Sequence, residues 1–528
     1  MTENSVRITV VTIASSDAAH ERLAMISTRI RKDADSAGAA SAHKDRFGRI
    51  ESAGIEYIPD DQRTSRPRNL FTVFFGGNFA FSVIVFGWLP ITFGLDFVGA
   101  ATASLTGLIV GTALIAPMAL LGPRTGTNNT VSSAAHFGTR GRLIGSGLTL
   151  LFALAYAAIA VWTSGDALVA AAERLLGIPI DGSTLAIGYA VISLEIVLVA
   201  LFGHGTVVAM QKFVAPVVGI LLLIGVVAFV PTFSPTNVHA DYLLGDFWPT
   251  WILSAVISVG GPLSYAPTLG DYSRRISRKD HSDRSVVAAT CVGVFLGLFV
   301  TALFGAFTAS AIPELGGSYV ADLVRSAPAW YLLPILIIAL AGGLGQGVLN
   351  LYASGLDLEA LFPRLRRIHT TLITSVIAVG LLYLGVFVFN AVDSITAMTL
   401  VLNGFAGPWV AINVLGFLLV RRGKYHAKDL QMFRANGPRG RYWFSNGWNL
   451  RAVIPWAIGS VFGLLATDTS LYTGPLSQLA GGIDLSFIGP TLIGGAGYLI
   501  AEWIWPETAL TTESAQAGGE HVLLSNHE

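Results

Sequence analysis

The chain has 528 residues, of which 53% are hydrophobic and 12% are charged, and its formal net charge is zero. A soluble domain carries about 25% charged residues and needs polar side chains to cover its core. This composition, with a mean hydropathy of +0.62, excludes a soluble globular protein and predicts an all-α, multi-pass membrane protein.

Hydrophobic runs long enough to cross a bilayer occur twelve times, since one span needs roughly 20 apolar residues. In chain order we predict spans at 70–94, 97–121, 146–173, 184–203, 213–231, 250–270, 286–311, 330–358, 370–391, 394–420, 452–467 and 485–506. Residues 1–68 and 507–528 lack sustained apolar periodicity, so we expect largely disordered tails. The spans form a ten-helix transport core (69–420), a polar loop (421–450) and two further helices (451–506).

The basic residues divide unequally between the two faces that these spans define. Of the 33 Lys and Arg residues, all but Arg174 and Arg325 fall on the face that carries both termini. Loops rich in Lys and Arg stay in the cytoplasm. We therefore expect a protein of the cell membrane with both tails in the cytoplasm.

The first and sixth spans contain helix-breaking residues. The first reads NLFTVFFGGNFAFSVIVFG, with Gly76, Gly77 and Asn78, and the sixth reads SVGGPLSYAPTLGDYSRR, with Gly260–Pro262 and Pro267. Freed backbone groups are tolerated in a membrane only where they line a protected cavity, and paired interruptions indicate a transporter site. Five spans separate the two breaks, which predicts inverted repeats at about 69–231 and 250–420. The alternative is that Gly and Pro are simply common in membrane helices.

The third span carries Trp162 and, one turn later, Asp166 on the same face. An aromatic ring beside a carboxylate suits a planar ligand rich in N–H donors, because stacking on a base contributes about 1–3 kcal/mol. Two simpler readings stay open. Trp162 can belong to the interfacial aromatic belt, and Asp166 can lie near the outer end of the span and reach water.

In the eighth span, Gln346 and Asn350 share one helix face within an apolar, glycine-rich stretch. A side-chain amide offers both a donor and an acceptor, which matches the edge of a heterocycle. The alternative is that these amides only join helices to one another by hydrogen bonds.

Several collinear motifs resemble those of bacterial purine/cytosine permeases in the nucleobase–cation symporter family. They are IESAGIEYIP with FFGGN near the first span, GPRTGTNN, HFGTRGR, LGDYSRR and NLYASGL. The resemblance, over roughly residues 50–506, implies a LeuT-like fold of twelve helices, a 5+5 inverted repeat plus two, with substrate between spans 1, 3, 6 and 8.

The same resemblance assigns the substrate site residue by residue. Counted from the FGTRG segment, Trp162 falls where hydantoin-type members stack a Trp, and Asp166 where they carry a hydrogen-bonding Gln. Asn350 matches their substrate-binding Asn. Gly261 and Pro262 fall at the break where those members place a second Trp, so Tyr265 or Phe81 is expected to take its place. The remaining expected substrate-binding residues are Gln346, Ser264, Asn78 and Ser82.

We expect coupling to a proton because this chain lacks the residues that form the sodium site in sodium-coupled members of the family. Sodium-coupled members place Ser and Thr five and six residues before the Asn, where this chain has Leu344 and Gly345. Asp166 is then the candidate proton carrier. Asp271, at the inner end of the sixth span, is a candidate for the inner gate, unless it only marks the membrane boundary.

The sequence thus predicts a symporter that imports cytosine, a purine or a similar small heterocycle. Alternatives are a sodium-coupled carrier or uniporter for hydantoin, allantoin, a vitamin-like heterocycle or an amino acid on the same fold. Clustered catalytic groups and metal-ligand spacings do not occur in the spans, so we expect neither an enzyme nor a cofactor or metal. The expected partners are the small substrate and the lipid bilayer, with no nucleic acid.

Overall fold

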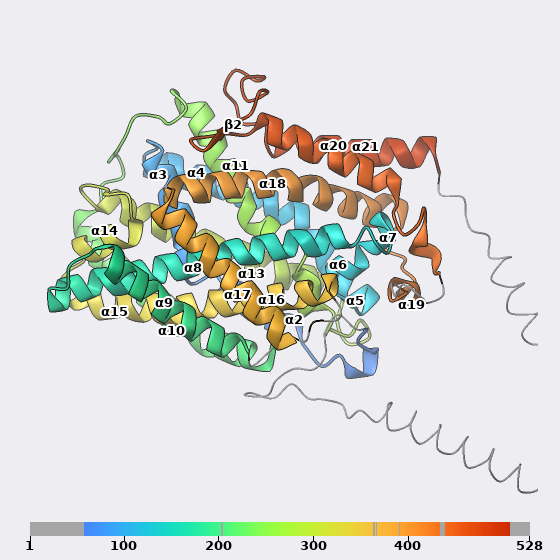
Figure 1. Cartoon of the computed structure of the whole chain (residues 1–528), viewed down its shortest axis with the longest axis horizontal. Coiled ribbons are helices and arrows are strands. Elements are labelled where there is room, and N and C mark those ends of the chain that lie inside the picture. Colours follow the sequence, from blue (N-terminus) through green and yellow to red (C-terminus); the bar gives the residue numbers. More distant parts are fainter. Residues whose placement is uncertain are drawn as a thin grey trace, which may run out of the picture. The chain divides into compact units, whose positions relative to one another are not determined.

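A computed structural model describes residues 57–506, apart from 202–203, 363–364, 366, 390 and 433–438. The tail predictions for 1–56 and 507–528 lie outside the described residues. The helices (Figure 1) are α2 (Pro67–Gly76), α3 (Phe81–Thr92), α4 (Phe97–Ile115), α5 (Leu121–Thr125), α6 (Asn129–Ser132), α7 (Ala134–Phe137), α8 (Leu143–Leu176), α9 (Gly182–Ala200), α10 (His204–Phe229), α11 (Phe247–Tyr265), α12 (Leu269–Ser273), α13 (Asp283–Ala311), α14 (Tyr319–Ser326), α15 (Leu332–Ile337), α16 (Gly343–Leu361), α17 (Arg367–Phe387), α18 (Ala391–Leu415), α19 (Ala427–Leu430), α20 (Leu450–Ala466) and α21 (Ile488–Ile504).

Shorter elements connect them. The 3-10 turns are η1 (Asp60–Gln62), η2 (Ala116–Leu120), η3 (Val230–Thr232), η4 (Ala329–Tyr331) and η7 (Arg441–Trp443), and the π-helical turns are η5 (Ile338–Gly342) and η6 (Gly416–Val420). Strands β1 (Asp468–Thr469) and β2 (Tyr472–Thr473) pair antiparallel between the last two helices.

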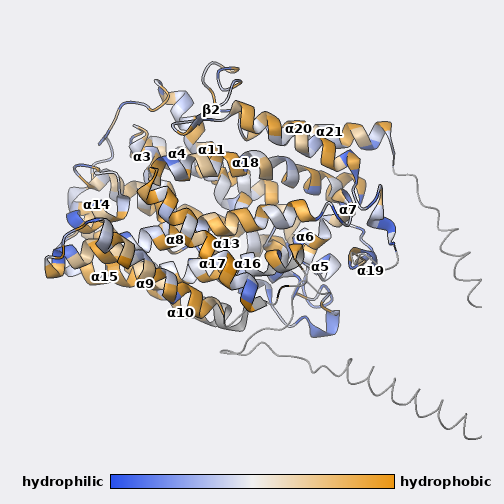
Figure 2. Cartoon of the chain, viewed as in Figure 1, coloured by the Kyte–Doolittle hydropathy of each residue, from blue (hydrophilic) through white to orange (hydrophobic). Residues whose placement is uncertain are grey.

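The predicted spans correspond to apolar helices. Among the described residues, nine helical segments are long and apolar enough to cross a membrane, and the bent pair α2 and α3 makes a tenth. Helices α20 and α21 have 17 residues each, at the lower limit for spanning, so the count of twelve stays a prediction there. Figure 2 shows hydrophobic residues along the long helices and hydrophilic ones near α5 and α19.

The two halves pack on each other reciprocally, as inverted repeats require. The first repeat comprises α2/α3, α4, α8, α9 and α10, and the second comprises α11/α12, α13, α15/α16, α17 and α18. Span 1 packs on spans 5 and 7, and its counterpart, span 6, packs on spans 10 and 2. Spans 3 and 8 pack on each other, span 4 on span 8, and span 9 on span 3. This symmetry places α8 and α16 side by side at the centre.

Both predicted interruptions exist, but the second lies later than expected. Helix α2 ends at Gly76, and α3 resumes at Phe81 after a bend of 58°. Helix α11 continues through Gly261 and Pro262 to Tyr265, and α12 begins at Leu269. The placement of Gly261 and Pro262 at the break is therefore corrected. Pro267, which has no N–H to donate, lies in the actual break.

Three of the predicted basic loops meet at one end of the molecule. The Arg124 guanidinium, after span 2, contacts the Asp283 carboxylate at the start of span 7 at 2.6 Å and donates to the Gly423 carbonyl at 3.0 Å. Arg421, after span 10, donates to the Ala135 carbonyl at 2.9 Å. These contacts require the loops to share a face, as the predicted topology has them, and we call this the basic end.

Helix α3 and helix α13 approach each other through glycines. A Cβ added to Gly87 would lie 1.8 Å from the Ala302 carbonyl oxygen, and one added to Gly305 would lie 2.1 Å from that of Ile84. Small residues allow such close backbone approach between membrane helices. The packing of span 1 on span 7 therefore depends on these two positions.

We predict that Gly305→Ala lowers the free energy of unfolding by about 1–3 kcal/mol, because the methyl group forces the two backbones apart. The matched control is Gly147→Ala in α8, where an added Cβ meets nothing within 4 Å. The measurement is the apparent melting temperature of the purified protein in detergent at one scan rate. Equal shifts for the two variants would contradict the close-packing argument.

Candidate functional site

Two adjoining hollows, which together we call the central cavity, lie between the two broken spans and the α8–α16 pair. Tyr156, Ser264, Tyr265 and Gln346 line both hollows. The other lining residues come from the same elements and from α4 and α13: Val73, Phe74, Asn78, Val83, Phe86, Leu108, Thr149, Phe152, Ala153, Ile257, Ser258, Gly261, Thr268, Tyr272, Leu298, Ala302, Leu349, Asn350 and Ala353. Such a position, bounded by interrupted helices, is where transporters bind substrate.

Aromatic rings form much of the cavity wall. Phe152 and Tyr156, four residues apart on α8, stack with ring centroids 6.4 Å apart. On the opposite side, Tyr265 packs edge-on against Phe74 at 5.5 Å. Flat faces on both sides suit a planar ligand.

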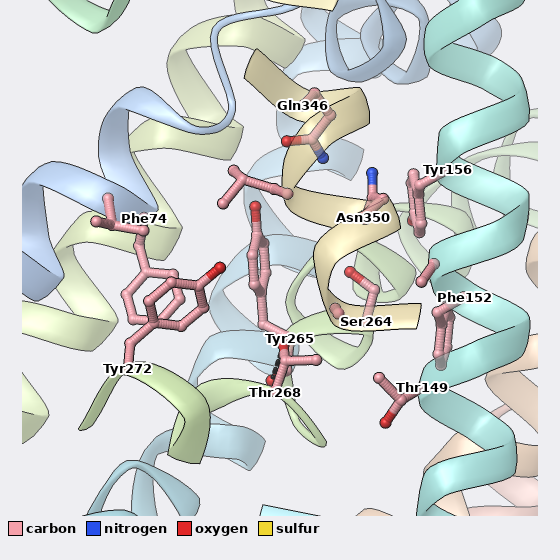
Figure 3. A pocket seen from close by; sticks show the side chains of 14 residues that line it. Phe74, Thr149, Phe152, Tyr156, Ser264, Tyr265, Thr268, Tyr272, Gln346 and Asn350 are labelled. Carbon is pink, nitrogen blue, oxygen red and sulfur yellow. Dashed lines mark hydrogen bonds between the residues drawn. The ribbon is translucent and has the colours of Figure 1, made fainter. Parts of the chain in front are cut away.

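Polar groups enter the cavity from three spans (Figure 3). Gln346 and Asn350 project from α16 near Tyr265 and Tyr156. The Gln346 Oε1 and Asn350 Nδ2 atoms are buried and have no hydrogen-bond partner among the described residues. The Tyr265 hydroxyl donates to Asn78 Oδ1 at 2.9 Å, which joins the two broken spans. The cavity therefore offers directional polar contacts between apolar walls.

The structure brings together six of the predicted site residues and separates five from them. Those lining the central cavity are Asn78, Gly261, Ser264, Tyr265, Gln346 and Asn350. Pro262 packs against Gly111 of α4, and Phe81 packs against Tyr319. Ser82 is buried in α3.

Trp162 and Asp166 line a different cavity, with Tyr189 and Ser318. The Asp166 carboxylate accepts from the Tyr189 hydroxyl and the Ser318 hydroxyl, each at 2.6 Å. Asp166 is ten residues beyond Tyr156 on α8, which corresponds to about 15 Å along the helix axis. The assignment of Trp162 and Asp166 to substrate binding stays a prediction. Neither residue lines the central cavity.

Sequence reasoning missed the pair Phe152 and Tyr156. This pair has the same four-residue spacing as Trp162 and Asp166, so its two side chains also share one helix face, ten residues earlier in the chain. Phe152 and Tyr156 line the same cavity as Asn350, whereas Trp162 and Asp166 line the other one, and their role in substrate binding stays a prediction. Thr149, Phe74 and Tyr272 carried no distinguishing signal.

The break in span 6 is stabilised by a residue from the loop between spans 2 and 3. Asn129 is fully buried, and its Nδ2 donates to the Ala266 carbonyl at 2.7 Å and to the Met118 carbonyl at 3.2 Å. The Ala266 carbonyl lies where α11 stops. The bond from Asn129 thus satisfies a backbone group that the break exposes.

At the basic end, Asp271 is buried on α12 near the carboxylate of Asp357, which also interacts with the Arg142 guanidinium. Burial lowers the pKa of Arg142 to about 10, against the opposing effect of Asp357, so Arg142 remains charged at neutral pH. Asp271 therefore belongs to a buried cluster of ionisable side chains that joins α12, α16 and the start of α8. Its role as a gate stays a prediction.

Two glycines of span 8 make close contacts, Gly342 with the break in span 1 and Gly343 with α8 of span 3. A Cβ added to Gly342 would lie 2.7 Å from the Phe79 carbonyl oxygen, and one added to Gly343 would lie 1.9 Å from Ser164 Oγ. Leu344, which follows, packs against the hydrophobic core. This turn of α16 has no hydroxyl side chain to offer a cation.

Comparison with known proteins agrees with this architecture. Residues 57–489 match a family model described as a permease for cytosine/purines, uracil, thiamine, allantoin. The Bacillus subtilis (strain 168) protein named "Putative purine-cytosine permease YxlA" is 28% identical over 448 residues, which are 83% of this chain and 93% of that protein.

Solved structures of a nucleobase-cation-symport-1 family transporter, Mhp1, share the fold. The closed conformation with bromovinylhydantoin bound has a TM-score of 0.67 at 19% identity, covering 89% of this chain and 97% of that one. The inward-facing conformation has a TM-score of 0.65 at 18% identity, covering 86% and 95%. The fold is therefore the LeuT-like fold expected from the sequence.

We predict that Asn129→Ala lowers the free energy of unfolding by about 1–3 kcal/mol, because the Ala266 carbonyl is left buried without its donor. Ser133→Ala is the control, since the Ser133 hydroxyl donates only within its own segment, to the Thr130 carbonyl at 2.6 Å. Melting temperatures of both purified variants provide the measurement. A larger shift for Ser133→Ala would show that Asn129 does not support the break.

Proposed function

The chain belongs to the family of permeases for cytosine/purines, uracil, thiamine and allantoin, and from this membership we propose that it imports a nucleobase, cytosine or a purine, by proton symport. It is a multi-pass membrane transporter, not an enzyme. The cell membrane is its proposed location, with the basic end and both termini in the cytoplasm.

The aromatic and amide side chains of the central cavity support this proposal. Phe152 and Tyr156 offer a stacked aromatic surface, and Gln346 and Asn350 offer unpaired amide atoms to the edge of a ring. Stacking on an aromatic side chain contributes about 1–3 kcal/mol per base. Amide atoms left unpaired in a buried cavity gain a partner when such a ring binds.

Alternating access follows from the two breaks. Because α2/α3 and α11/α12 are interrupted beside the cavity, each half-helix can tilt about its break while α8 and α16 remain packed together. Substrate enters from one face, the cavity closes around it, and the half-helices at the basic end then separate to release it.

A proton is the proposed coupling ion. The junction of η5 and α16, nearest the span 1 break, presents Gly342, Gly343 and Leu344, whereas sodium requires oxygen ligands. Asp166 is the proposed proton carrier because it is a buried carboxylate within a span, held by hydroxyl groups of α9 and of the segment before α14.

We predict that reconstituted protein accumulates a labelled base when a pH gradient is imposed. The assay offers cytosine, adenine, hypoxanthine, uracil, allantoin and hydantoin to proteoliposomes, first with a proton gradient and then with a sodium gradient. Asn350→Leu is expected to reduce uptake about tenfold, the effect of losing roughly 1.4 kcal/mol of binding.

Ser375→Ala is the control for that variant, because Ser375 lies outside the cavity and its hydroxyl donates within α17 to the Thr371 carbonyl. Uptake driven only by sodium, or of only hydantoin or allantoin, would replace the proposal with the corresponding alternative. Unchanged uptake by Asn350→Leu would place the substrate elsewhere.

A separate prediction concerns coupling. Asp166→Asn cannot carry a proton, so it should abolish accumulation driven by a pH gradient while leaving exchange of labelled for unlabelled base across the membrane. Asp181→Asn, at the exposed start of α9, should retain both activities. Full accumulation by Asp166→Asn would eliminate Asp166 as the carrier without affecting the substrate proposal.

A further inference from the structure

Two arginines at the basic end share one aromatic ring. The guanidinium carbon of Arg140, between α7 and α8, lies 5.2 Å from the ring centroid of Trp443 in η7, and that of Arg439 lies 5.1 Å from the same centroid. Arg140 and Arg439 are exposed, whereas Trp443 is partly buried. Indole rings attract cations over their faces. We call these three residues the arginine–tryptophan patch.

The patch carries two positive charges without an acidic partner. In the part of the chain that the structure describes, neither of its guanidinium groups forms an ion pair or a hydrogen bond. The neighbouring arginines differ, because Arg441 lies 3.6 Å from the Asp429 carboxylate and Arg451 lies 3.2 Å from the Glu502 carboxylate. Two like charges held on one ring repel each other, and salt at physiological strength screens them only in part. An anion that contacts both groups would remove this repulsion.

Backbone contacts hold the patch in place. The Thr139 N–H donates to the Tyr442 carbonyl at 2.9 Å, and the Arg140 N–H donates to the Gly447 carbonyl at 2.8 Å. A Cβ added to Gly447 would lie 2.6 Å from the Arg140 side chain, so the stem of that side chain packs directly on the loop. The η7 turn also contacts α7 and α19, which lie at the same end of the molecule in Figure 1. The loop between spans 10 and 11 is thus fixed to the start of span 3.

The patch lies at the level of the membrane surface. Phe444, which follows Trp443, has its ring 5.6 Å from the guanidinium carbon of Arg451 in the first turn of α20. Arg451 donates to the Trp505 carbonyl at 3.1 Å, at the end of α21, where Trp503 and Trp505 are 84% and 69% exposed. Exposed tryptophans are typical of the membrane–water interface. Lipid headgroups are therefore the phosphates nearest to the patch.

We propose that the arginine–tryptophan patch binds the headgroup of one anionic phospholipid from the leaflet at the basic end. Both guanidinium groups contact its phosphate, since arginine forms paired hydrogen bonds with phosphate oxygens. The acyl chains lie along α20, where Leu450, Ile454 and Ile458 are exposed at four-residue spacing. The bound lipid thereby joins the loop between spans 10 and 11 to the start of span 3. This site is independent of the substrate and of the coupling ion.

The test compares an anionic lipid with a zwitterionic one. Native mass spectrometry of the purified full chain, titrated with phosphatidylglycerol or phosphatidylcholine of the same acyl chains, counts the bound lipids and gives their Kd values. We expect one phosphatidylglycerol to bind with a Kd at least about tenfold lower than that of phosphatidylcholine. Both guanidinium groups contact the phosphate, so Arg140→Gln and Arg439→Gln should each raise that Kd about tenfold.

Lys279→Gln is the matched control, because it removes one positive charge at the same end of the molecule. The Lys279 side chain is 83% exposed and pairs with Asp60 at 3.3 Å, away from any aromatic ring named here. Its Kd for phosphatidylglycerol should stay within about threefold of the wild-type value. Melting temperatures without lipid verify that each variant is folded, and the two arginine variants test the patch independently of each other.

Equal Kd values for the two lipids in the wild-type protein would overturn the proposal. So would an equal loss of affinity in Lys279→Gln and the two arginine variants, because the attraction would then be general to the basic end. Stabilisation of the full chain by inorganic phosphate alone, lost in Arg140→Gln, would assign the patch to a free anion and also overturn it. None of these measurements depends on transport, so the proposed function and this inference can fail separately.

Discussion

Interrupting a helix inside a membrane exposes backbone carbonyls and amides that lipid cannot satisfy, and this constraint organises the protein. Each break acquires its partners from elsewhere in the chain. Asn78 folds back on the Phe74 carbonyl at the first break, and Asn129 reaches from a distant loop to the Ala266 carbonyl at the second. At the first break the same residue also lines the central cavity, so Asn78 serves both the fold and the site.

Close packing between helices of the two repeats is the second constraint on the fold. The reciprocal contacts between the repeats bring broken spans against the intact spans of the other half, and glycines such as Gly87 and Gly305 permit the approach. A glycine also permits close approach in η5, where Gly342 lies beside the Phe79 carbonyl. Because the backbones touch, a tilt of one half-helix has to displace its neighbour as a unit, which suits rigid-body alternation.

Local sequence signals predicted most of the fold and only part of the site. Apolar length located the spans, and Gly76, Gly77 and Asn78 marked the first break. In span 6 Pro262 misled, because it is accommodated inside α11, whereas Pro267 lies in the actual break beyond Tyr265. Helical periodicity identifies a face but not a depth, so it does not decide between Trp162 and Tyr156, and of these two only Tyr156 lines the central cavity. The contact of Asn129 with Ala266 joins residues 137 positions apart, and one sequence gives no signal for such a pair.

The dual use of Asn78 has an evolutionary consequence. A substitution there would alter the helix break and the hydrogen bond that holds the Tyr265 hydroxyl beside the cavity at once, so the two properties cannot drift independently. Phe152 and Tyr156 lie on an unbroken stretch of α8, so a substitution there does not alter a helix break. Divergence of substrate preference among descendants of this chain should therefore accumulate on α8 first, and directed evolution toward a new cargo has most freedom there.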